Sequence, residues 1–266
     1  MCRWVAYAGG SVYLKDILFD PENSLVRQSV HARQSSQTTN GDGFGVAWYG
    51  DHRAPGLFRD ILPAWNDENL RSIAHQIRSS LFFAHVRAST GTGISRANCH
   101  PFVYENWCFM HNGRIGDWAR LRRDVEHMID PALFGHRLGT TDSEAIFLIA
   151  LSNGLAHDPE MAMRRTLGEI LRLHERHGGD EPLRFSAALT DGTTIRAFRF
   201  SSDHRSPSLV YGTRAGGEGG DDGTVDIIAS EPYDDPGMRW AEVAEGEAIA
   251  WHDGRIEHHP FDPAAA

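Results

Sequence analysis

The chain has 266 residues, of which 41% are hydrophobic, and a formal net charge of −10 from 26 basic and 36 acidic residues. This length can bury a large core in one domain or two. The basic residues are scattered along the chain, so we expect neither nucleic acid nor an anionic membrane as a partner. Lys15 is the only lysine, which excludes a phosphate loop ending in Gly-Lys.

Targeting and redox features indicate a soluble cytoplasmic protein. The longest apolar run, residues 145–151, is far shorter than the roughly 20 residues that cross a bilayer, and the N-terminus lacks the apolar core of a signal peptide. Cys2, Cys99 and Cys108 make an odd count without a C-x-x-C pair, which fits a reducing compartment. The 15 histidines show no metal-ligand spacing, so we expect no metal and no other cofactor.

The first two thirds of the chain combine short strands with amphipathic helices. Aromatic and β-branched runs bounded by turn residues predict strands at residues 3–8, 43–49, 57–61, 81–87 and 107–111. Helical periodicity predicts helices at residues 67–79, 116–129, 142–153 and 158–177. The third of these helices is apolar enough to be largely buried, and its start offers Thr140, Thr141 and Asp142 as capping residues, with Glu144 placed to complete a capping box.

The last third of the chain returns to strands. They are predicted at residues 183–190, 193–200, 208–213, 225–230 and 247–260. Hairpin turns are predicted at Asp191-Gly192 and Asp253-Gly254. A mobile loop is predicted at residues 215–223. Strands, then helices, then strands, without a long linker or a repeat, predict one α+β domain over residues 1–266, in which helices cover two sheets.

Cys2 directly follows Met1, and an initiator methionine is normally removed before a small residue. Removal leaves a free α-amine on the cysteine. Because an α-amine titrates near pH ~7.7 and a thiol near ~8.5, one residue would then hold both a nucleophile and a base that activates it. The alternative is that Cys2 is simply a small hydrophobic residue beside a strand.

Arg87 and Thr90 lie where a predicted strand passes into a loop, in residues 85–92 (HVRASTGT). A bidentate guanidinium at that point suits a substrate carboxylate, with the Thr90 hydroxyl assisting. The alternative for Arg87 is an ion pair on the surface.

Asn112 and Gly113 follow another predicted strand and could form a hairpin turn. The helix predicted from residue 116 argues against a return strand, and an asparagine amide beside a glycine N–H suits an oxyanion hole. Asp142 is open to two interpretations, as a helix cap or as the partner of a substrate ammonium group.

Together, these motifs resemble the class II glutamine amidotransferases, which are N-terminal-nucleophile hydrolases. The shared segments occur in the family's order: residues 1–4 (MCRW), 41–48 (GDGFGVAW), 85–90 (HVRAST), 98–101 (NCHP), 111–113 (HNG), 141–144 (TDSE) and 229–232 (ASEP), followed by Trp240. Residues 41–45 could pass for a nucleotide loop, but they match a strand of the family and lack the helix that a phosphate site needs.

The resemblance implies a four-layer αββα sandwich. It implies that Cys2 attacks the side-chain amide of glutamine, forming a glutamyl thioester and releasing ammonia, with its own α-amine as the base. Asn112 and Gly113 would form the oxyanion hole. Arg87 and Thr90 would hold the substrate α-carboxylate, and Asp142 would hold the α-ammonium.

Two positions depart from the synthase-fused members of this family, which carry tryptophan and histidine where this chain has Ala88 and Gly91. The sequence is more similar to small stand-alone members, so ammonia would pass, if at all, to a separate synthase. Two alternatives stay open: hydrolysis of another γ-glutamyl compound, as in ergothioneine-type thiol biosynthesis, and a non-catalytic scaffold that kept the fold.

Overall fold

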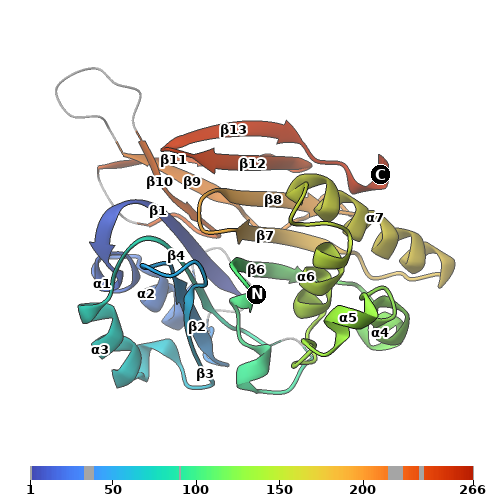
Figure 1. Ribbon diagram of the computed structural model, residues 1–266, viewed down its shortest axis with the longest axis horizontal. Helices are drawn as coiled ribbons and strands as arrows, with labels where there is room; N and C mark the ends of the chain where they lie inside the picture. The colour runs from blue at the N-terminus through green and yellow to red at the C-terminus, as the bar shows by residue number, and fades with distance from the viewer. Residues whose placement is uncertain (1, 33–38, 90, 215–223, 234–236, 266) are drawn as a thin grey trace.

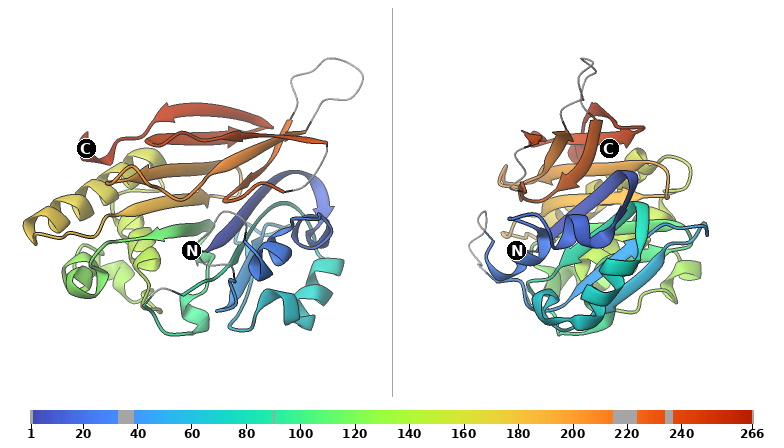
Figure 2. Two further views of the ribbon diagram at one scale, coloured as in Figure 1. Left: turned by 180° about the vertical axis from the view of Figure 1, so that it is seen from behind. Right: turned by 90° about the vertical axis from the view of Figure 1, so that its left-hand side faces the viewer.

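Strand pairing builds two antiparallel sheets that stack face to face, each covered on its outer side by helices (Figures 1 and 2). The computed structural model describes residues 2–32, 39–89, 91–214, 224–233 and 237–265. The layers run helix, sheet, sheet, helix, so the predicted four-layer αββα sandwich of α+β class is confirmed.

The first sheet has seven strands in the order β11-β9-β10-β1-β4-β2-β3. Their bounds are β1 Arg3–Tyr13, β2 Phe44–Trp48, β3 Gly56–Asp60, β4 Arg78–Val86, β9 Val210–Arg214, β10 Thr224–Ala229 and β11 Met238–Glu242. Strand β1 pairs with β10 on one side and β4 on the other, with Trp4 opposite His85 and Val5 opposite Ala229. The N-terminal strand is therefore held along both edges.

The second sheet has six strands in the order β13-β12-β8-β7-β6-β5. Their bounds are β5 Phe102–Tyr104, β6 Trp107–Arg114, β7 Arg184–Thr190, β8 Ile195–Ser201, β12 Glu247–His252 and β13 Arg255–Pro260. Strand β6 continues through Asn112 and Gly113, which pair with Ser186 and Phe185 of β7. The alternative of a hairpin turn at Asn112-Gly113 is therefore wrong.

The helices form the two outer layers. Those over the first sheet are α1 Leu14–Leu18, α2 Leu25–Val30 and α3 Glu68–Gln76. Those over the second sheet are α4 Trp118–Glu126, α5 Pro131–Phe134, α6 Asp142–Ser152 and α7 Pro159–Arg176. Short 3₁₀ turns complete the described elements: η1 Ala64–Asn66, η2 Arg96–Asn98 and η3 Pro263–Ala265.

Side-chain alternation along the strands fills three separate cores. In β4, Phe82 packs under the helices while its neighbour Phe83 packs between the sheets, because successive strand residues face opposite sides. In β6, Phe109 packs under the second helical layer and Met110 packs between the sheets. The layer between the two sheets is thus built from alternate residues of both.

The predicted elements are confirmed in type, with differences at their ends. Strand β1 runs to Tyr13 instead of residue 8, because its far end still pairs with β4. Among the helices and strands, five short ones were not predicted, since none is long enough to show a periodicity: α1, α2, β5, α5 and β11. The predicted loop at 215–223 lies outside the described residues.

The capping box predicted for α6 is wrong in one half. Thr141 Oγ1 does accept from the backbone N–H of Glu144 at 3.2 Å. The Glu144 carboxylate does not return that contact. It accepts instead from the backbone N–H groups of Leu138 and Gly139, at 3.2 and 2.7 Å, and pairs with Arg137 at 2.5 Å. A guanidinium within reach attracts the carboxylate more strongly than a single N–H does.

Candidate active site

A cavity of about 380 Å³ opens where β1 begins and where β4 and β6 end. Its wall includes Cys2, Arg87, Gly113 and Asp142, which lie far apart in the sequence. The fold therefore brings four of the six predicted site residues to one pocket. Of the other two, Asn112 is buried next to Gly113, and Thr90 lies outside the described residues.

Cys2 is half-buried, and its Sγ donates to the backbone carbonyl of Ala88 at 3.6 Å. Burial raises the pKa of the thiol, and the Ala88 contact and the charge of Arg87 only partly offset that rise. The thiol is thus protonated near neutral pH, and a base must remove its proton before it can attack. The carbonyl of Cys2 is fixed as well, because Arg3 Nη1 donates to it at 2.9 Å.

Asn112 presents its side chain to the layer between the sheets. Strand alternation places it on the same face of β6 as Cys108 and Met110, and Trp4 of β1 faces the same layer. Both polar side-chain atoms of Asn112 are buried and have no partner among the described residues. A buried amide without partners is energetically unfavourable, so this amide is suited to a polar group that enters from the pocket.

Gly113 tolerates no side chain. A Cβ atom at this position would lie 1.9 Å from the carbonyl oxygen of Arg184 and 2.5 Å from His111 Nε2. The backbone also has a φ of +156°, which residues with a Cβ rarely adopt. Strand β6 can therefore keep its pairing with β7 beside the pocket only with glycine here.

Arg87 follows the last residue of β4 and is only 3% exposed. Its Nη2 donates to Thr92 Oγ1 at 2.7 Å and to Ser89 Oγ at 3.1 Å, and its Nη1 donates to the carbonyl of Asp42 at 3.3 Å. These partners are neutral, and no carboxylate of the described residues forms an ion pair with it. The alternative of a surface ion pair is wrong, and a buried cation of this kind favours an incoming carboxylate.

Asp142 is the first residue of α6, and Thr141 before it provides the cap. Asp142 Oδ2 accepts from the backbone N–H of Ile115 at 2.8 Å, and its Oδ1 accepts from that of Ser143 at 2.8 Å. In the part of the chain that the structure describes, no cation pairs with it. The carboxylate is therefore held in place at the pocket wall with its charge uncompensated by a side chain.

Three buried histidines, for which no role was predicted, lie in or next to the wall of the pocket. His100 and His111 line the cavity, and the ring of His85 stacks on that of His100 at 4.2 Å. His111 Nδ1 lies 2.9 Å from Ser143 Oγ. Burial lowers the pKa of all three, that of His85 to about 3, so their rings are neutral. Their positions in the sequence could have indicated a role at the site, because each histidine lies inside one of the family's shared segments (HVRAST, NCHP, HNG).

The two positions that depart from the synthase-fused pattern, Ala88 and Gly91, both line the pocket. Further along the wall lie Trp118 and the ion pair between Arg114 and Glu181, whose charged groups are 3.6 Å apart. The sequence predicted no role for these three residues, although Arg114 directly follows Gly113. The fold brings them together, because Arg114 ends β6, Trp118 begins α4 and Glu181 lies just before β7.

The glycines around the start of β2 serve packing. A Cβ at Gly43 would lie 2.6 Å from Cys99 Sγ, and one at Gly45 would lie 2.3 Å from the carbonyl oxygen of His100. The segment 41–45 leads into strand β2, with no helix behind it. It thus lacks the helix N-terminus that a phosphate site uses.

The described residues include no group of three histidine, cysteine or acidic side chains arranged to hold a metal ion. Within the same described ranges, none of the helices combines the length and the apolar character needed to cross a membrane.

Two relatives of known description are similar to this chain over most of its length. The chain is 36% identical over 227 residues to the probable glutamine amidotransferase DUG3 of Saccharomyces cerevisiae; this match covers 75% of the chain and 64% of that relative's length. It is 28% identical to the gamma-glutamyl-hercynylcysteine sulfoxide hydrolase of Mycolicibacterium smegmatis, over 98% of the chain and 100% of the relative.

A solved structure from Silicibacter pomeroyi, described as a glutamine aminotransferase class-II domain protein, superposes with a TM-score of 0.75 at 35% identity. The superposition covers 98% of this chain and 100% of that one. The family described as "Glutamine amidotransferases class-II" matches residues 20–264. On this match, together with the shared fold and the pocket described above, the chain belongs to the class II glutamine amidotransferases.

Proposed function

We propose that the protein hydrolyses the side-chain amide of glutamine to glutamate and ammonia, with Cys2 as the nucleophile once Met1 has been removed. The observation that carries the proposal is the pocket in which Cys2, Arg87, Gly113 and Asp142 meet. It combines a thiol, a buried cation, a strand-end N–H and a fixed carboxylate, which are the groups that an amino-acid amide requires.

Two charged groups recognise the amino-acid head of the substrate. Arg87 holds the α-carboxylate, because its guanidinium is buried among neutral oxygen atoms. Thr90 assists Arg87. Asp142 holds the α-ammonium, because its carboxylate is fixed by the backbone N–H of Ile115 and lacks a cationic partner among the described residues. Both charges of the zwitterion are matched, which fixes the scissile amide at Cys2.

Acylation starts when the α-amine of Cys2 takes the proton from Sγ. The sulfur attacks the side-chain amide carbon, and the negative charge of the tetrahedral intermediate develops on the amide oxygen. Asn112 Nδ2 and the Gly113 N–H stabilise that oxygen. The ammonium of Cys2 then returns its proton to the leaving nitrogen, the C–N bond breaks, and ammonia and a thioester result.

Deacylation repeats these steps with water as the nucleophile. The α-amine takes a proton from the water, whose oxygen attacks the thioester carbon, and Cys2 leaves as the thiol after regaining that proton. Glutamate is released. Because the thiol pKa is raised by burial, the sulfur is a better nucleophile once ionised but depends on the amine for ionisation.

A second candidate substrate is a larger γ-glutamyl compound. The cavity volume of about 380 Å³ lies within the range of roughly 300–1,000 Å³ of pockets that enclose drug-sized ligands, which are larger than glutamine. Trp118 and the pair Arg114–Glu181 extend its wall beyond the predicted site residues. A relative that covers 98% of the chain is named for such a hydrolysis.

We further propose that residues 1–266 form one domain that acts in the cytoplasm without a cofactor, passing ammonia, if at all, to a separate synthase. Strand β1 pairs with β10, so both ends of the chain contribute to one sheet. All three cysteines are free, which supports a reducing compartment.

The test is glutamate release from glutamine by protein whose N-terminus has been verified by intact mass. Cys2→Ala and Cys2→Ser should lower kcat by at least ~10³-fold. Cys108→Ala is the matched control, because Cys108 is buried between the sheets and does not line the pocket. If the Cys2→Ala variant still released glutamate from glutamine at the wild-type rate, the proposal would be wrong. Parallel kinetics on γ-glutamyl amides then decide between the two substrates by kcat/KM.

A further inference from the structure

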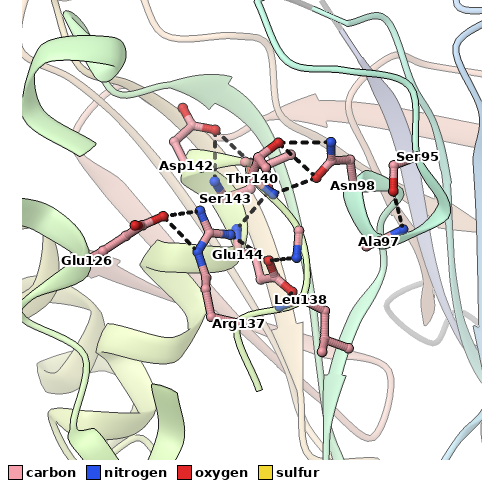
Figure 3. Close-up of polar contacts among 12 residues, drawn as sticks. Ser95, Ala97, Asn98, Glu126, Arg137, Leu138, Thr140, Asp142, Ser143 and Glu144 are labelled. Atoms are coloured by element: carbon pink, nitrogen blue, oxygen red, sulfur yellow. Dashed lines mark hydrogen bonds and ion pairs between the residues drawn. The ribbon is translucent and has the colours of Figure 1, made fainter. Parts of the chain in front are cut away.

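Asn98 links the two sides of the pocket without lining it. It ends the 3₁₀ turn η2, is 2% exposed and lies outside the cavity wall. Its Nδ2 donates to the carbonyl of Gly93 at 2.8 Å and to Thr140 Oγ1 at 3.0 Å. Its Oδ1 accepts from the backbone N–H of Thr140 at 2.7 Å. Both ends of the amide are used (Figure 3).

The two segments that Asn98 joins carry the two charges proposed to recognise the substrate. Gly93 belongs to the loop after β4, and its carbonyl also lies 3.3 Å from Arg87 Nη2. Thr140 lies two residues before Asp142, on the segment that leads into α6. One side chain therefore connects the carboxylate side of the pocket to its ammonium side.

The Thr140 side of this link is rigid. The side chain of Arg137 is 4% exposed and pairs with Glu126 of α4 at 2.9 Å and with Glu144 of α6 at 2.5 Å. Glu144 in turn accepts from the backbone N–H of Gly139 at 2.7 Å. Figure 3 shows these contacts meeting the Asn98–Thr140 contacts along one short stretch of chain.

The Gly93 side of the link is not tied to a helix by ion pairs of this kind among the described residues. Among the described contacts, its carbonyl is held by Asn98 and by Arg87 itself. The amide orientation of Asn98 is also fixed by its partners, because a backbone N–H needs the oxygen and a carbonyl needs the nitrogen. Position 98 thus requires a donor and an acceptor at once.

We propose that Asn98 is a positioning residue that sets the distance between Arg87 and Asp142, and thereby the selectivity for a substrate carrying both an α-carboxylate and an α-ammonium. The inference rests on the proposed function. Both charges bind groups on one carbon atom, so a shift of about 1 Å between the two sides weakens their joint contact strongly.

The test compares Asn98→Asp and Asn98→Ala with the wild type. Asn98→Asp keeps the acceptor for Thr140 but sets a carboxylate oxygen against the Gly93 carbonyl. We expect KM for glutamine to rise about 10- to 100-fold in both variants, with kcat changed less than about threefold, because head binding is lost equally from ground state and transition state. A fall in kcat at unchanged KM would overturn the inference.

A second readout isolates the joint recognition. The wild type should prefer glutamine strongly over 4-aminobutanamide, which lacks the α-carboxylate, and over glutaric acid monoamide, which lacks the α-ammonium. The Asn98 variants should lose about tenfold or more of that preference. Equal preference in variant and wild type would contradict the inference.

Three controls keep the result interpretable. Asn106→Ala removes another buried asparagine, whose Nδ2 donates to the carbonyl of Asp191 at 2.8 Å away from the pocket, and should leave KM unchanged. Alkylation of Cys2 by iodoacetamide, which needs no amino-acid head, should proceed at the wild-type rate in Asn98→Asp. Gly139→Ala offers an independent route, since its Cβ would lie 2.5 Å from Asn98 Oδ1, and should raise KM as well.

The two proposals fail in different ways. A wild-type protein that hydrolyses neither glutamine nor a γ-glutamyl amide removes the proposed function. An active wild type whose KM and substrate preference survive Asn98→Asp removes only the role of Asn98.

Discussion

Arg3 and Glu231 form an ion pair that is withdrawn from water directly behind Cys2. Arg3 Nε lies 3.0 Å from Glu231 Oε2, and both side chains are at most 2% exposed. Asn23 Nδ2 also donates to Glu231, at 3.4 Å. Buried pairs of this kind contribute little net stability compared with apolar residues of the same size. Their geometric effect is clearer, because the same guanidinium holds the Cys2 carbonyl at 2.9 Å.

Replacing one partner should therefore destabilise the protein, and replacing both should restore stability but not activity. Arg3→Met leaves a buried carboxylate without its cation, at a cost of about 3–5 kcal/mol. The double variant Arg3→Met/Glu231→Leu should recover most of that loss in urea denaturation. If its kcat also recovers to the wild-type value, the pair does not position Cys2.

Helix α6 shows how one element can serve both the fold and the site. The sequence predicts a largely buried helix, and residues 143–150 are buried as expected. Thr141 caps the helix and also lines the pocket beside Asp142. Helix α7 begins in a similar way, because Asp158 accepts from the backbone N–H of Met161 at 3.0 Å. Asp158, however, does not line the pocket.

The two caps form a matched pair of variants. Thr141→Ala and Asp158→Ala should each lower the free energy of unfolding by about 1 kcal/mol, because each leaves a helix N–H without its acceptor. Only Thr141→Ala should raise KM for glutamine, by several-fold, since it loosens the start of the helix that carries Asp142. Thermal melting and steady-state kinetics measure the two effects. An equal KM in both variants would show that the α6 cap has no part in substrate binding.

The packing of the whole molecule keeps three histidines neutral beside the active site. His85, His100 and His111 are buried, and desolvation lowers the pKa of each below its usual value near 6.5, that of His85 to about 3. Above about pH 6.5 these rings are neutral in both the folded and the unfolded chain. Below that pH the unfolded chain binds protons that the folded chain excludes, so stability falls as the pH decreases.

Between pH 7.5 and 5.5, His85 alone should therefore reduce the free energy of unfolding by about 1 kcal/mol, following the ~1.4 kcal/mol per pKa unit of linkage. His100 and His111 should add to that loss, because their pKa values are lowered in the same direction. Urea denaturation at both pH values measures the loss. His100→Gln should reduce the pH dependence by one histidine's share, whereas His252→Gln should not, because the side chain of His252 is 68% exposed. A wild-type protein equally stable at the two pH values would contradict neutral burial.

Much of the fold and many of the candidate site residues could be predicted from the sequence, because secondary structure and motifs depend on residues that are close together in the chain. Strand alternation, helical periodicity and the motifs around Cys2, Arg87, Asn112 and Asp142 needed no long-range information. The short elements α1, α2, β5, α5 and β11 were not predicted, since a few residues carry no measurable periodicity and form only through tertiary contacts. The roles of the site residues remain proposals.

The sequence by itself determined the resemblance to the family and the candidate residues, because motifs depend on residue type and order. The four-layer fold followed as what that resemblance implies. Tertiary structure alone decided which groups meet. It turned the Glu144 carboxylate away from its predicted cap toward Arg137, stacked His85 on His100, and placed Asn98 between Gly93 and Thr140. Of these contacts, the one between Asn98 and Thr140 spans more than forty residues. In every case the partners are chosen by distance in space, which no local pattern encodes.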